Sequence, residues 1–351
     1  MRRFGAVVTL VLVAGLAACS DEAPVAAPSP APSPSASPTP APAPTKRPPP
    51  ARPAPPKVNP LTGRPGVPGR PVIVTKIDDT ASGRPQIGVE YADVVYVEQV
   101  EGGATRLAAV FASRQPTTVG PVRSVRNMEP ELLGAYGRPA LAYSGGAAGP
   151  VARLRSSKVA DAGPTTRGAF YRRLGSRPAP YNLVVDLASM ARTLRHVTRP
   201  VDVGFRWAER DARVTTARKV GVVSVNVGRT RQTFRWDPRS RLWIRLDASG
   251  RVIRTAAGRP EATPNVAVQL SRVRLDPTNV DVTGTPSAYT STVGRGALLL
   301  FRDGRVMNGQ WVRRTAGTKT WYLDPRGRPL TLDPGGAWVL LADRRSPPTY
   351  R

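Results

Sequence analysis

Six carboxylates lie within 24 residues of a chain that is otherwise strongly basic: Asp78, Asp79, Glu90, Asp93, Glu98 and Glu101. The 351 residues include 52 Lys or Arg against 24 Asp or Glu, and the formal net charge is +28. Grouped carboxylates can act as general acid and base, and arginine forks near them can clamp an anion. We therefore define a candidate polar site of seven residues: Asp79, Arg84, Glu98, Glu101, Arg106, Arg123 and Arg126.

Two interpretations of the polar site are open. In the first, Glu98 or Asp79 is a carboxylate acid or base, and Arg84, Arg106, Arg123 and Arg126 are anion clamps. In the second, the charged residues form structural ion pairs that fix a hairpin, and such pairs produce the same sequence pattern. The sequence favours the second interpretation and assigns a catalytic role to no residue.

The Gly102-Gly103 pair predicts the turn of that hairpin. A two-residue turn would place Gln99 opposite Arg106 and would make Glu101 a diagonal neighbour of Arg106 on one face of the sheet. Glu98 would then lie on the other face. We expect a structural ion pair between Glu101 and Arg106.

The chain contains one Cys and one His, and this restricts the chemistry that it can perform. A single Cys excludes an internal disulfide and a Cys-rich metal site, and a single His excludes a His-cluster metal site. A phosphate-binding GxxxxGK[ST] motif and a strand-linked GxGxxG motif are both missing. We expect no cofactor and no metal ion.

The N-terminus has the pattern of an export signal. Arg2 and Arg3 precede an apolar run of about 13 residues, which is too short to span a membrane stably. Leu16-Ala17-Ala18-Cys19 follows, so basic, apolar and small-residue segments occur in the order of a signal peptide. Because Cys19 directly follows Leu-Ala-Ala, it resembles the bacterial lipobox. We expect a signal peptide over 1–18 and acyl chains such as palmitate on Cys19, which would anchor the protein at the extracytoplasmic face of the cell membrane.

A proline-rich segment follows Cys19. Residues 24–56 hold 15 of the 39 prolines, spaced by Ala, Ser and Thr. Proline fixes φ and donates no backbone hydrogen bond, which excludes regular helix and sheet. We therefore expect residues 19–56 to be a disordered, semi-rigid tether of extended polyproline character.

The composition becomes that of a globular protein from Lys57 onward. Five apolar runs predict buried strands: 72–77, 94–100, 106–111, 140–143 and 183–185. Three further stretches predict helices: 129–136, 150–158 and 187–196. Strands interleaved with helices predict an N-terminal mixed α/β layer subdomain over 57–205.

The second half of the chain is rich in hairpin-turn signals beside short β-rich runs. The runs are 242–246, 298–301 and 338–341. They predict a smaller antiparallel β-rich subdomain over 218–344, so the expected fold class of the whole chain is α+β.

Several short motifs occur in an order that resembles a known family. They are Asn59–Gly63, Arg84–Gly88, Ala92–Tyr96, Glu101–Arg106, Val119–Arg126, Phe234–Asp237, Trp243–Arg245, Asn265–Gln269 and Gly296–Trp311. In this order and spacing they resemble the YerB-like bacterial lipoproteins, a family defined by domain of unknown function 3048. The resemblance implies an envelope-anchored lipoprotein with N- and C-terminal parts, and it supplies no activity. Where the family usually shows Pro-His-Asn-Leu, this chain has Tyr181, so a mechanism that required the His would not operate here.

These observations lead to a functional hypothesis. We expect a membrane-anchored extracytoplasmic lipoprotein that acts as a binding or scaffold module for an anionic wall component or a protein partner. The alternative is an envelope hydrolase that cleaves glycan or peptide through two carboxylates, which would face each other about 5–10 Å apart across a groove. The export signal argues against a nucleic-acid partner. The sequence predicts neither an enzymatic activity nor an oligomeric state.

Overall fold

The computed structural model describes residues 57–280 and 284–351. The expected signal peptide, Cys19 and the proline-rich tether lie outside these residues. Among the helices that are described, none combines the length and the apolar character needed to cross a membrane.

The first half of the chain contributes five strands to a central sheet. They are β1 (Ile73–Asp78), β2 (Val94–Gln99), β3 (Thr105–Phe111), β4 (Ala140–Ala142) and β5 (Ala160–Asp161). β3 is antiparallel to both β1 and β2, whereas β4 runs parallel to β1 and β5 parallel to β4. Nearly every residue of β1, β2 and β3 is buried, as expected for strands covered on both faces. The strands expected at 72–77, 94–100, 106–111 and 140–143 are confirmed.

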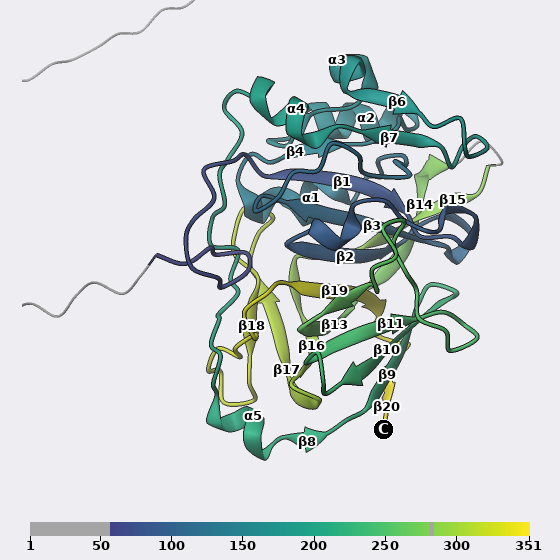
Figure 1. Cartoon of the computed structure of the whole chain (residues 1–351). Helices are drawn as coiled ribbons and strands as arrows, with labels where there is room; N and C mark the ends of the chain where they lie inside the picture. The colour runs from purple at the N-terminus through teal and green to yellow at the C-terminus, as the bar shows by residue number, and fades with distance from the viewer. Residues whose placement is uncertain (1–56, 281–283) are drawn as a thin grey trace, which may run out of the picture. The chain divides into compact units, whose positions relative to one another are not determined.

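The second half extends the same sheet. Its strands are β13 (Asn265–Ser271), β16 (Gly294–Arg302), β17 (Arg305–Arg313), β18 (Trp321–Leu323) and β19 (Ala337–Asp343), and β8 (Arg218–Lys219) pairs with β17. The strand order is β18-β17-β16-β13-β19-β2-β3-β1-β4-β5. β19 lies between β2 and β13 and is parallel to both (Figure 1). The central sheet therefore runs through both halves of the chain, and the boundaries 57–205 and 218–344 stay predictions.

A second, antiparallel sheet packs against the C-terminal part of the central sheet. Its order is β12 (Ala262–Thr263), β11 (Leu242–Leu246), β10 (Thr230–Asp237), β9 (Val222–Val227) and β20 (Thr349–Tyr350). Phe234 meets Trp338 and Trp243 meets Phe301, each with ring centroids 5.7 Å apart. Two further hairpin sheets pair β6 (Tyr171–Arg173) with β7 (Leu183–Val185) and β14 (Val273–Val280) with β15 (Pro286–Thr290).

The helices are short. They are α1 (Glu129–Leu133), α2 (Ala148–Arg155), α3 (Pro164–Arg167), α4 (Leu187–Thr193) and α5 (Ala212–Thr216). α1, α2 and α4 pack on the N-terminal part of the central sheet, whereas α5 lies beside β17 (Figure 1). Leu132 of α1 and Leu154 of α2 join the apolar core on one face of the sheet, and Leu187 and Met190 of α4 join the core on the other face. Helix-covered and β-rich regions in one chain confirm the α+β fold class.

Candidate functional site

The loop between β2 and β3 sets the register of the polar site. Its tip is a 3-10 turn of three residues, Glu101–Gly103, and both glycines of this turn have positive φ, 61° and 79°. Glu98 therefore lies opposite Arg106, and Gln99 lies opposite Thr105. The prediction of a two-residue turn was wrong by one position. Because strand side chains alternate, that shift moves Glu98 to the face of Arg106.

The turn between β9 and β10 approaches the β2–β3 loop closely at Gly103. The backbone N–H of Arg229, in the turn between β9 and β10, donates to the carbonyl of Gly103 at 2.8 Å. A Cβ at Gly103 would lie 3.0 Å from the Arg229 nitrogen and 2.6 Å from its Cγ. The loop thus needs glycine at a point where the second half of the chain docks on the first.

Glu101 pairs with Arg126 and not with Arg106. Both carboxylate oxygens of Glu101 accept hydrogen bonds from this guanidinium, from Nε and, at 2.7 Å, from Nη2. Burial raises the pKa of Glu101, but the Arg126 guanidinium outweighs burial and holds the pKa below its ordinary value. The predicted Glu101–Arg106 pair was therefore wrong, because the register shift gives Arg106 other neighbours.

Asp78 is the carboxylate that faces Arg106. Their closest oxygen and nitrogen are 4.0 Å apart, while Arg123 Nε lies 2.9 Å from the other oxygen of Asp78. The guanidinium of Arg123 in turn lies 5.5 Å from the ring centre of Tyr181. Burial lowers the pKa of Arg106.

A fully buried triad lies on the same face of the sheet. The ammonium group of Lys76 contacts Glu98 and lies 2.7 Å from Oε1 of Glu129, and none of the three side chains is exposed. Burial, opposed by Lys76 and reinforced by Glu129, raises the pKa of Glu98 to about 7. Sequence reasoning missed Lys76 and Glu129. A lysine inside an otherwise apolar strand was the available signal.

Asp79 and Arg84 lie on the opposite side of the sheet, in a second buried network. Asp79 lies 3.2 Å from Arg84 and 2.7 Å from Arg245 of β11, and Arg245 also reaches Glu261 at 2.8 Å. Burial raises the pKa of Asp79, but the Arg245 guanidinium overrides it and holds the pKa at about 2. Sequence reasoning missed Arg245 and Glu261, although an arginine in an apolar strand again marked the position.

The seven residues of the polar site therefore do not form one group. Asp79 and Arg84 belong to one network, while Glu98, Glu101, Arg106, Arg123 and Arg126 lie around the other face. Each carboxylate of the site contacts at least one cation: Glu98 contacts Lys76, Glu101 contacts Arg126, and Asp79 contacts Arg84 and Arg245. Pairing of this kind is expected of structural ion pairs.

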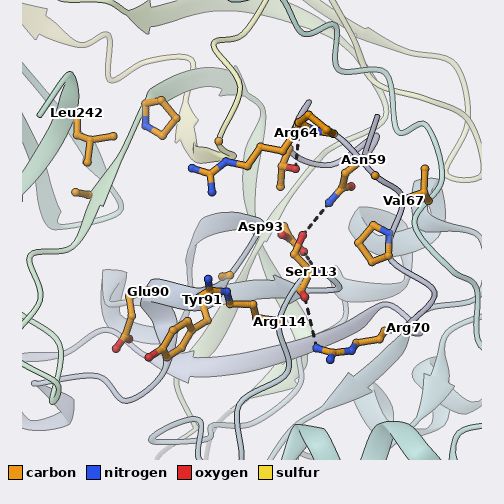
Figure 2. Close-up of a pocket in the computed structure, with 18 of the residues that line it drawn as sticks. Asn59, Arg64, Val67, Arg70, Glu90, Tyr91, Asp93, Ser113, Arg114 and Leu242 are labelled. Carbon is orange, nitrogen blue, oxygen red and sulfur yellow. Dashed lines mark hydrogen bonds between the residues drawn. The ribbon is translucent and has the colours of Figure 1, made fainter. Parts of the chain in front are cut away.

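An open cleft of about 650 Å³ lies apart from the polar site. Its walls come from both halves of the chain: residues 59–70, 90–93 and 113–114 on one side, and residues 242, 259, 262, 264 and 335 on the other. Figure 2 shows the charged side chains around it. Four arginines line the cleft: Arg64, Arg70, Arg114 and Arg259.

Asp93 holds the wall of the cleft in place. One of its oxygens accepts the backbone N–H groups of Ala112 and Ser113, each at 2.8 Å. The Ser113 hydroxyl accepts a hydrogen bond at 2.8 Å from Asn59, which joins the segment 59–70 to the sheet (Figure 2). Burial raises the pKa of Asp93 despite these hydrogen bonds and the charge of Arg64.

The cleft arginines differ from those of the polar site in their partners. None of the four forms an ion pair with any carboxylate in the described part of the chain, whereas Arg84, Arg106, Arg123 and Arg126 all have one. The guanidiniums of Arg114 and Arg259 lie over the Tyr91 ring, 5.7 and 5.5 Å from its centre. Sequence reasoning missed this cleft, because its arginines come from three separate segments of the chain and follow no motif.

Comparisons with known proteins agree with the family resemblance. The N-terminal domain of DUF3048, a protein of unknown function, matches residues 61–199, and the DUF3048 C-terminal domain matches residues 223–339. "Putative lipoprotein YerB" of Bacillus subtilis (strain 168) is 27% identical over 285 residues, which are 77% of this chain and 80% of that protein. The crystal structure of the Bacillus subtilis YerB protein has the same fold, with a TM-score of 0.68 at 21% identity, and covers 84% of this chain and 99% of that chain. Because the two matched domains together span most of its length, this chain belongs to the YerB-like DUF3048 family, whose function is unknown.

Proposed function

We propose that this protein is a membrane-anchored lipoprotein of the cell envelope that binds an anionic wall component in the arginine-lined cleft. Anchoring is supported by the lipobox-like sequence that ends at Cys19 and by the similarity to a protein named as a putative lipoprotein. Binding is supported by one observation: the four cleft arginines form no ion pair with a carboxylate among the described residues, although Glu90 and Asp93 line the same cleft and Arg64 acts on Asp93 at longer range.

Unpaired guanidiniums in a concave site favour an anionic ligand for two reasons. Several positive charges on the walls of a cleft focus the electrostatic potential and attract anions from solution. Each guanidinium also presents a planar fork of N–H donors that matches a carboxylate or phosphate group. Arginines that already contact Asp or Glu have part of this capacity occupied, so the cleft is a better anion site than the polar site.

The pairing in the polar site bears on the hydrolase alternative. A glycan hydrolase needs one carboxylate to donate a proton and another to attack or to activate water across an open groove. Glu98, Glu101 and Asp79 each contact a cation and are largely or fully buried, and this favours binding over hydrolysis. An acidic protein partner would contact the same cleft arginines. The test below distinguishes such a partner from a wall component.

Binding to isolated cell walls tests the proposal. The lipidated full-length protein, kept in nonionic detergent, is sedimented with walls at increasing salt. Attraction by the general positive surface should weaken smoothly with salt, whereas contacts inside a cleft are screened less. We expect Arg64→Ala with Arg70→Ala to abolish the salt-resistant fraction of bound protein.

Arg295 and Arg314 provide the matched control. Both are exposed, both lack an ion pair with a described carboxylate, and they lie together at one end of β16 and β17. Arg295→Ala with Arg314→Ala removes the same charge and should leave salt-resistant binding intact. Equal losses in the two double variants, with no binding left at high salt, would contradict the cleft as the site. Binding to whole envelopes but not to purified walls would instead indicate a protein partner.

A further inference from the structure

The cleft brings cationic groups from both halves of the chain to one aromatic ring. Tyr91 belongs to a short 3-10 turn before β2, Arg114 follows β3, and Arg259 precedes β12. The two guanidiniums lie 5.7 and 5.5 Å from the ring centre of Tyr91, and Figure 2 shows Arg114 beside this ring. The Tyr91 ring is thus a shared contact for two arginines that are 145 positions apart in the sequence.

This arrangement makes Tyr91 a positioning residue. A cation over an aromatic face is attracted by the ring quadrupole, so the ring restrains both exposed guanidiniums near one place. Restraint before binding reduces the conformational entropy that a ligand would have to remove. The Tyr91 hydroxyl has no hydrogen-bond partner within the described ranges, so the aromatic ring and not the hydroxyl is the group that acts.

The directions of the arginines indicate the kind of anion. A planar carboxylate is satisfied by one guanidinium fork along one edge. A linking phosphate has two charged non-bridging oxygens on a tetrahedral phosphorus and two bridging oxygens out of their plane, so two guanidiniums from different segments can approach it from different sides. Arg64 and Arg70 line the same cleft and supply further positive charge along it, as successive anionic groups of a chain would require.

The shape of the site separates a polymer from a membrane. The four arginines line a recess of about 650 Å³ with walls from several segments. A flexible chain can enter such a recess, whereas a headgroup would have to leave the plane of its bilayer to reach it. The observations therefore favour a soluble or wall-attached chain over a lipid surface.

We propose, building on the function proposed above, that the cleft takes a linear phosphate-linked polymer. Arg114 and Arg259, restrained by Tyr91, bind one phosphate, while Arg64 and Arg70, which lie apart from each other along the cleft, contact other phosphates of the same chain. The ligand contacts both halves of the chain at once.

Competition between probes of matched charge tests the ligand class. Fluorescently labelled short-chain inorganic polyphosphate is titrated with the lipidated protein in nonionic detergent, at about physiological ionic strength and at higher salt. Unlabelled polyphosphate, poly-glutamate and micelles containing phosphatidylglycerol are the competitors. We expect polyphosphate to compete at a lower charge concentration than the other two. Equal competition by poly-glutamate, or better competition by the lipid micelles, would overturn the proposal.

Variants of Tyr91 test the clamp. Tyr91→Phe keeps the ring and should bind polyphosphate like the wild type. Tyr91→Ala removes the ring and should weaken binding roughly fivefold or more. Removing Arg114 should cost less affinity in the Tyr91→Ala background than in the wild type, since the ring no longer restrains it. If Tyr91→Ala lowers the melting temperature, the Arg114→Ala, Arg259→Ala double variant carries the test. Unchanged binding in that variant would overturn the clamp.

The two proposals fail in different ways. In one outcome, wall binding depends on Arg64 and Arg70, but substitutions of Tyr91, Arg114 and Arg259 do not change polyphosphate binding. The proposed wall-binding function of the cleft would then stand, and the proposed phosphate site at Tyr91 would be wrong. If the wild type binds neither walls nor any polyanion better than the cleft variants do, both proposals fail.

Discussion

Glu98 illustrates how burial changes what a carboxylate can do. The sequence suggests an acid or base at the edge of a site, but the side chain is fully buried beside Lys76 and Glu129. Burial raises the pKa of Glu98, and the nearby Glu129 charge adds to this effect while Lys76 opposes it, so Glu98 holds its proton to higher pH than usual. Glu98 therefore contributes to stability in a pH-dependent way.

The raised pKa of Glu98 predicts a specific pH dependence of folding. The carboxyl has an ordinary pKa of 4.5, and in the folded state the pKa is about 7. Between these values the folded protein binds a proton that the unfolded chain does not. The stabilisation is fully present below pH 4.5, and the free energy of unfolding falls as pH rises toward about 7. Glu98→Gln should flatten this decline, as measured by urea unfolding at several pH values across that window.

Glu101→Gln is the control for this prediction. Its carboxyl also belongs to the polar site, but its pKa is lowered. The stability it contributes is lost as pH falls through the lowered value, below the window of Glu98. Glu101→Gln should therefore leave the decline between about pH 5 and 7 in place. An unchanged decline in Glu98→Gln would contradict our assignment of the buried proton.

At the scale of elements, the loop between β2 and β3 decides which charged residues meet. The three-residue turn at its tip, Glu101–Gly103, sets Glu98 opposite Arg106. The positive φ angles of this turn are possible because its second and third residues are glycine. The positive φ of Gly103, 79°, and the nearby Arg229 backbone leave no room for a side chain.

Gly103→Ala should therefore destabilise the protein more than Gly102→Ala. Both positions have positive φ, which costs an alanine roughly 1–2 kcal/mol. A Cβ at Gly102 would have no atom within 4 Å, whereas a Cβ at Gly103 would lie 3.0 Å from the Arg229 nitrogen. Urea unfolding of the two variants measures the difference. Equal losses of unfolding free energy in the two variants would contradict a close contact between Gly103 and the turn between β9 and β10.

At the scale of the whole molecule, the N-terminal segment is expected to determine where the protein resides. Cys19 lies outside the described residues, and lipid attachment there is a prediction from Leu16-Ala17-Ala18-Cys19 alone. Cys19→Ala should yield an unprocessed or soluble protein, because no acyl chain can then be attached. Radiolabelled palmitate should enter the wild type only. Equal retention of both proteins on membranes after a high-salt wash would rule out the lipid anchor.

Many of the elements could be predicted from the sequence, because their signals are local. The apolar run of β1 and the exact span of β11 follow from short stretches of sequence. The position of β19 could not, since its parallel pairing with β2 and β13 joins segments more than 60 residues apart. The sequence of residues 338–341 does not indicate which strand pairs with β19.

The candidate site was partly predictable for the same reason. The sequence identified the charged residues of the polar site. The turn between β2 and β3 is one residue longer than predicted, and Glu101 therefore pairs with Arg126 and not with Arg106. Arg313 and Arg314 are neighbours in the sequence, and no local signal distinguishes them. Arg313 is buried and donates to the carbonyls of Glu131 and Leu132, while Arg314 is exposed.

Length, charge, the lipobox-like cysteine and the order of family motifs are properties of the chain itself, and they indicated the envelope location and the family without a structure. Which of the 46 arginines remain free to bind a ligand is a property of the folded molecule. A guanidinium is neutralised or left unpaired according to the carboxylates within a few ångströms of it, and those come from distant segments. Arg106 and Arg114 are eight residues apart in the sequence, yet folding places the first beside Asp78 and the second over Tyr91 in an open cleft.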